Sequence, residues 1–79
     1  NMSNINAMLL IGTKSGTERK VYDELNKHDE IEFVNELFGT WDIIAKIQTE
    51  SVERMDEFVS DIIRNIKGVD STMTLIVSR

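Results

Sequence analysis

Two short segments of the sequence carry groups that could bind a small polar molecule. In the first, Gly39 has no side chain to shield its backbone amide, and Asp42 supplies a carboxylate next to the single tryptophan of the chain. In the second, Thr72 and Thr74 place two hydroxyls, which both donate and accept hydrogen bonds, on one face of a strand. A carboxylate for an ammonium group, with amides and hydroxyls for a carboxylate, is what an amino-acid zwitterion requires. The candidate ligand-binding residues are Gly39, Thr40, Trp41, Asp42, Thr72 and Thr74.

A purely structural role is the alternative for each of these residues. Asp42 can cap the turn that precedes a strand, and Trp41 can belong to the core. Threonine is a common strand residue whatever its function, because its branched side chain suits a pleated sheet. The residue types alone therefore leave open whether the two segments bind a ligand.

The sequence shows no group of residues with the composition of a catalytic or metal centre. His28 is the single histidine and lies in the polar run that ends the first predicted helix. No nucleophile and orienting residue accompany it, so we interpret it as a solvated surface residue. The acidic residues near the second predicted helix are interpreted as a solvated face: Glu50, Glu53, Asp56, Glu57 and Asp61. We expect no enzyme activity, no metal site and no cofactor.

Composition restricts the class of protein further. Nine basic and 14 acidic side chains give a net charge of −5, and an acidic domain is poorly suited to neutralise phosphates, so we expect no direct nucleic-acid partner. The apolar run 7–11 is too short to span a bilayer, so no membrane partner is expected. The absence of cysteine fits a cytoplasmic location. A chain this short buries only about 60–65% of its unfolded surface, which makes another subunit the expected source of added stability.

Hydrophobic periodicity divides the chain into four strands and two helices. Strands are predicted over residues 5–12, 31–38, 41–48 and 72–78. The first helix is predicted to begin with a capping box between Ser15 and Glu18, and the second to run from the N-cap Ser51 to Gly68. A type II′ turn at Gly39-Thr40 is predicted to join the second and third strands. The second helix carries a broad apolar stripe: Val52, Met55, Phe58, Val59, Ile62, Ile63 and Ile66.

This order of elements predicts an α+β, ferredoxin-like βαββαβ fold, with a four-stranded antiparallel sheet and both helices on one face. The first strand is nevertheless apolar on both sides, and Ile44 and Ile76 are assigned to the uncovered face. An uncovered apolar face of this size indicates an interface, so we expect a homodimer that packs sheet against sheet. The single domain is predicted over residues 6–79, with residues 1–5 as a disordered segment or a cloning remnant.

Four segments carry a resemblance to a known family: residues 14–18 (KSGTE), 38–46 (FGTWDIIAK), 66–69 (IKGV) and 71–76 (STMTLI). With them the chain resembles the stand-alone ligand-binding domain, or RAM domain, of the Lrp/AsnC regulators, from about residue 6 to residue 77. The segment around Gly39 and Asp42 is the most specific part. The resemblance implies the ferredoxin-like fold, dimers that pair through their sheets, frequent rings of four dimers (octamers), and amino acids or related effectors bound between dimers.

The resemblance also implies roles for individual residues. Gly39 and Asp42 match the hairpin-loop part of the family's effector site, and Thr72 and Thr74 match the part before and within the last strand. Trp41 departs from the family pattern, in which the aromatic residue is often tyrosine. Full-length members contact DNA through a helix-turn-helix, for which no residues remain here. The implied function is a regulatory module that senses an amino acid or similar effector without touching DNA, oligomerises, and can associate with a full-length Lrp/AsnC paralogue.

Two other functions stay open on the sequence alone. One is a purely structural oligomerisation partner that binds no ligand, which replacement of Asp42 would separate from a sensing module. The other is a small dimeric ferredoxin-like enzyme without a cofactor, a class that includes monooxygenases and isomerases. Those enzymes usually place His, Tyr or Asn inside a deep pocket, whereas the strands here are aliphatic.

Overall fold

The computed structural model describes residues 4–78 of the chain, in the predicted order of elements. The strands are β1 (Ile5–Thr13), β2 (Ile31–Glu36), β3 (Ile43–Thr49) and β4 (Val69–Ile76). The first helix is α1 (Glu18–Leu25). The second helix is α2 (Val52–Glu57), followed by the π turn η1 (Phe58–Ile62) and the 3₁₀ turn η2 (Ile63–Asn65). Of the predicted N-terminal segment, residues 1–3 lie outside the described part, and Ile5 already belongs to β1.

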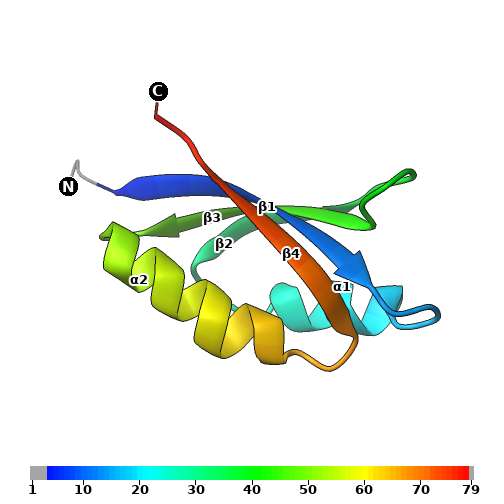
Figure 1. Ribbon diagram of the computed structural model, residues 1–79. Helices are drawn as coiled ribbons and strands as arrows, with labels where there is room; N and C mark the ends of the chain where they lie inside the picture. Colours follow the sequence, from blue (N-terminus) through cyan, green and yellow to red (C-terminus); the bar gives the residue numbers. More distant parts are fainter. Residues whose placement is uncertain (1–3, 79) are drawn as a thin grey trace.

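The strands form one antiparallel sheet in the order β2-β3-β1-β4, and both helices lie on the same side of it (Figure 1). β1 is central, so that Leu9 pairs with Ala45 of β3 on one side and with Thr74 of β4 on the other. Each helix connects two strands that are separated in the sheet by one other strand, which is the ferredoxin-like arrangement. The predicted α+β fold is confirmed.

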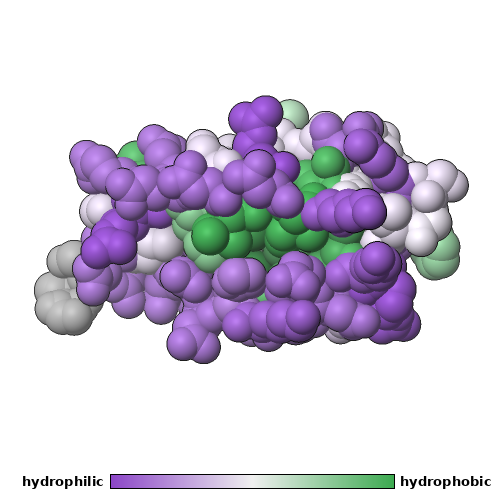
Figure 2. Space-filling view, turned by 90° about the horizontal axis from the view of Figure 1, so that it is seen from below, coloured by the Kyte–Doolittle hydropathy of each residue, from purple (hydrophilic) through white to green (hydrophobic). Residues whose placement is uncertain are grey.

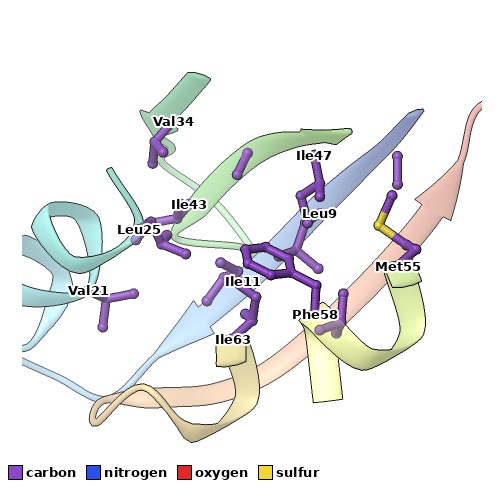
Figure 3. Close-up of a cluster of buried hydrophobic side chains, with 13 residues drawn as sticks. Leu9, Ile11, Val21, Leu25, Val34, Ile43, Ile47, Met55, Phe58 and Ile63 are labelled. Atoms are coloured by element: carbon purple, nitrogen blue, oxygen red, sulfur yellow. The ribbon is translucent and has the colours of Figure 1, made fainter. Parts of the chain in front are cut away.

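The core lies between the helices and one face of the sheet (Figure 3). Alternate residues of the two central strands point into it and are fully buried: Ala7, Leu9, Ile11, Ile43, Ala45 and Ile47. From the helices come Val21, Leu25, Met55, Phe58, Val59 and Ile63. A side chain of this kind contributes about 1.5–3 kcal/mol when it is fully buried, so the meeting of a period-2 strand pattern with a helical stripe accounts for the fold.

The second helix starts as predicted and then changes its winding. The Ser51 side chain accepts a hydrogen bond from the amide of Arg54 at 3.1 Å, as an N-cap does. The helix then widens into η1, and Ile62 is 38% exposed although the regular stripe included it. Past the helix, Gly68 has the positive φ of 105° that its position predicted.

The predicted capping box at the first helix is wrong. The N-cap of α1 is Thr17, and no side chain bonds to the amides of the first turn. The Thr17 hydroxyl instead donates to the carbonyl oxygens of Lys14 at 2.6 Å and Gly68 at 3.4 Å. Ser15 lies in the preceding turn, where Gly16 has a φ of +83°. The glycine lets the chain reverse direction first, so the helix begins later than the pattern indicates.

The connection between β2 and β3 is also longer than the predicted two-residue turn. Glu36 pairs with Ile43, so residues 37–42 form the loop, which projects beyond the end of the sheet (Figure 1). The amide of Leu37 closes the loop by donating to the carbonyl oxygen of Asp42 at 2.8 Å. The predicted type II′ turn is therefore wrong, and Trp41 lies in the loop rather than in the third strand.

The sheet face opposite the helices is apolar and open. The register brings Leu10 of β1 beside Ile44 of β3 and Met73 of β4, and it brings Met8 beside Leu75. Met73 and Leu75 are 46% and 49% exposed, while the other three are half-buried by their neighbours. Within residues 4–78 nothing covers this face, as the sequence predicted.

One assignment on the last strand is wrong. Ile76 pairs with Ala7, whose side chain points into the core, so Ile76 lies on the helix side of the sheet and not on the open face. The apolar pattern of β4 is misleading because β4 is an edge strand. Its helix-facing residues are only partly covered, so they need not be the more hydrophobic set.

Candidate ligand-binding site

Asp42 is hydrogen-bonded to the neighbouring strand β1. Its amide donates to the carbonyl oxygen of Ile11 at 3.0 Å, and its Oδ2 accepts from the amide of Thr13 at 2.8 Å and from the Thr13 hydroxyl at 3.3 Å. Thr13 lies beyond Ile11, the last residue of β1 that pairs with β3, so its amide is not used in that ladder and is available to Asp42. Asp42 therefore has a structural role, but its carboxylate bonds to β1 instead of capping the turn of its own hairpin. Its second oxygen, Oδ1, forms no hydrogen bond within residues 4–78.

Trp41 lies against the sheet at the same end. A Cβ placed on Gly12 would be 3.9 Å from Cε3 of the indole, an ordinary van der Waals contact, so the ring packs beside this glycine. The missing side chain makes room for Ser71 instead, whose hydroxyl oxygen would be 2.6 Å from that Cβ. Gly12 pairs with Ser71, and both residues alternate with core-facing neighbours, so they belong to the open face. Trp41 is half-buried there and does not belong to the core cluster. Its indole ring therefore forms one side of the candidate site, at the end of β1 and β4.

The tip of the loop is fully open to solvent. Gly39 has a φ of +140°, and a Cβ placed on it would meet no described atom within 4 Å. Thr40 is exposed, and so is the preceding Phe38, with a relative exposure of 108%. These residues are accessible to a ligand or to another subunit, and they contribute little to the stability of the chain by itself.

Thr72 and Thr74 do not converge with the loop inside one chain. They pair with Ile11 and Leu9, which point into the core, so the two hydroxyls face the helix side of the sheet. Asp42 and Thr72 flank β1 on opposite sides, and two strand spacings separate them by about 10 Å. The two segments therefore do not form one site within a single subunit.

The structure also has a feature that the sequence analysis missed, on the helix side. A depression of about 490 Å³ lies between the second helix and the end of β3, and another of about 420 Å³ lies between the second helix and α1. His28, interpreted as solvated, is half-buried there, with its ring edge-on to Phe58 at 5.6 Å between centroids. The broad apolar stripe of the second helix was the available signal, since it is wider than the sheet can cover.

Comparison with known proteins assigns the chain to a family. Residues 6–79 match the model described as the Lrp/AsnC ligand binding domain, and the chain therefore belongs to this family. It is 39% identical over 74 residues to the HTH-type transcriptional regulator FL11 of Pyrococcus furiosus, covering 94% of this chain and 48% of that protein. The chain thus spans about half the length of the curated relatives it matches.

Solved structures agree with this assignment. FFRP-DM1 superimposes with a TM-score of 0.90 at 29% identity, over 92% of this chain and 97% of that one. Escherichia coli AsnC has the same fold, with a TM-score of 0.90 at 24% identity over 95% of this chain and 51% of that one. The resemblance drawn from the four sequence segments is confirmed, and the family is regulatory rather than enzymatic. Among residues 4–78, no helix has the length and apolar composition needed to cross a bilayer.

Proposed function

We propose that the chain is a regulatory module that assembles through its open sheet face and binds an amino acid or similar small effector at a site completed between subunits. The apolar sheet face that the helices leave uncovered is the observation that supports assembly. A small domain gains from burying Met73 and Leu75 against a second copy, and a two-fold axis would supply the same apolar surface from both sides. Rings of four dimers, and association with a full-length Lrp/AsnC regulator, extend the same proposal.

The effector part of the proposal depends on the two separated segments. One subunit offers Oδ1 of Asp42 and the open amides near Gly39, and a neighbouring subunit would supply the hydroxyls of Thr72 and Thr74. Trp41 would shape the wall. A transcriptional regulator of Neisseria meningitidis with this fold, at 17% identity, was solved as a complex with L-Met, so L-methionine is a reasonable first probe.

The test compares Asp42→Asn with wild type. Asparagine keeps a side-chain oxygen that accepts the Thr13 amide, but it removes the charge that would bind an ammonium group. Titration calorimetry with the twenty amino acids should show binding to wild type, and roughly tenfold or greater weakening in Asp42→Asn at an unchanged melting temperature. Asp56→Asn, which removes a charge from an exposed position on α2, is the matched control and should bind normally.

A purely structural oligomerisation partner is the second candidate. The bonds from Asp42 to Thr13 favour it, because they hold the loop in place without a ligand. If no amino acid gives a heat of binding and the oligomer is intact, the effector site is refuted and the structural oligomerisation partner is supported. Equal weakening in Asp42→Asn and Asp56→Asn would mean that overall charge, and not the loop, governs binding.

A further inference from the structure

An apolar groove lies on the helix side of the molecule, away from the open sheet face. Figure 2 shows an apolar strip between two polar bands on this side. Asp61 and Ile62 line both the depression beside β3 and the depression beside α1, so the two adjoin along the second helix and together form the groove. Phe58, Ile62 and Ile66 supply the apolar side chains of its lining.

The π turn η1 builds this lining into the second helix. It begins with Phe58, whose ring reaches the core and still lines the groove, and it ends with Ile62, which is 38% exposed. A π turn is less stable than regular helix and is frequently found at functional sites. Here the widened turn leaves an isoleucine facing solvent in the middle of the groove, which the packing of the core does not require.

Charge around the groove is strongly uneven. At the end next to β3, five carboxylates face one arginine: Asp29, Glu30, Glu50, Glu57 and Asp61 against Arg54. At the other end, Lys20 and Lys67 face Glu24, and Asp61 lies where the two ends meet. A second copy of this chain carries a net charge of −5 and would be repelled by the acidic end. Anionic lipid and nucleic acid would be repelled in the same way, so a basic polypeptide is the complementary occupant.

The length of the groove fits a short helix. It extends along the second helix from Arg54 to Ile66, which at 1.5 Å per residue is about 18 Å, or roughly three turns of a partner helix. We propose that this groove binds an amphipathic helical segment of a partner protein, with apolar residues at helical spacing and lysines or arginines concentrated toward one end. The apolar stripe would cover Ile62, and the basic end would meet the carboxylates next to β3.

This inference is independent of the effector site, since the groove shares none of the residues proposed for that site. The probe is a fluorescein-labelled synthetic helix of fourteen residues, with leucines at helical spacing and lysines on the remaining positions of one half. Binding is followed by fluorescence anisotropy. The matching peptide with glutamate in place of lysine should not bind.

Two double variants make the same charge change on the second helix, one at residues that line the groove and one at residues that do not. Glu57→Lys with Asp61→Lys reverses the groove, whereas Glu53→Lys with Asp56→Lys reverses exposed residues that do not line it. We expect the groove pair to weaken peptide binding by roughly tenfold or more, and the control pair by less than about twofold. Ile62→Gln should also weaken binding, because it removes apolar contact without changing charge.

Three results would overturn the proposal. The first is no saturable binding of the lysine peptide below about 1 mM, the weak limit of specific recognition. The second is equal weakening by the two charge pairs, which would reflect net charge alone. The third is a set of amide NMR shifts along the groove that change on dilution without peptide, which would make the groove a contact between copies of this chain.

Discussion

Replacement of Leu75 by glutamine should dissociate the proposed dimer. Leu75 is 49% exposed, and full burial of a leucine is worth about 1.5–3 kcal/mol, so burying the remaining half contributes roughly 1 kcal/mol. An amide enclosed without a partner costs roughly another 1 kcal/mol or more. A two-fold interface contains the residue twice, which brings the total to about 4 kcal/mol. The dissociation constant of the dimer should therefore rise roughly a thousandfold.

Sedimentation velocity and light scattering over about 1–100 μM would measure this change. Val52→Gln is the matched control, because Val52 is 44% exposed but lies on α2, on the other side of the molecule. The control should keep the mass of the wild type. If Leu75→Gln keeps that mass at 1 μM, or if Val52→Gln dissociates to the same extent, the open sheet face is not the interface and the reasoning fails.

Further predictions concern the turn at Gly68 and the caps of the two helices. Gly68→Ala should lower the free energy of unfolding by about 3 kcal/mol in urea titration, because φ is +105° and a Cβ would lie 2.7 Å from the Thr17 side chain; a loss below about 1 kcal/mol would mean that this turn rearranges freely. Ser51→Ala should cost about 1 kcal/mol through its lost cap, while Ser15→Ala should cost less than about 0.5 kcal/mol in the same experiment. Equal losses at the two serines would restore the capping box at Ser15.

The hydrophobic pattern of neighbouring residues predicted a strand or helix correctly wherever that pattern alone determines which side chains are buried. Alternation in β1 and β3 assigned Leu9, Ile11 and Ala45 to the core, and a serine before an apolar stripe located the start of α2. These signals depend on residues close in sequence, and the packing of sheet against helices agrees with them.

Contacts distant in sequence caused the errors. The hydroxyl of Thr17 bonds to Gly68, 51 residues away, which displaces the start of α1 from Ser15. Asp42 bonds to Thr13, 29 residues away, so the loop is fixed by β1 and not by a tight turn within its own hairpin. Neither partner can be identified from a local pattern, because strand order must be known first.

The candidate site, too, depends on strand order, which a local sequence pattern does not reveal. The sequence identified suitable groups in Asp42 and Thr72, but strand order separates them by about 10 Å within one subunit. If the proposed effector contacts two subunits, binding and assembly must be linked, and each must strengthen the other by the same free energy. At a hundred times its dissociation constant an effector stabilises the bound assembly by about 2.7 kcal/mol. Effector should therefore recover much of the assembly lost in Leu75→Gln, although Leu75 lies outside the candidate site. Light scattering that shows no recovery at saturating effector would show that the effector does not link the two subunits of this interface.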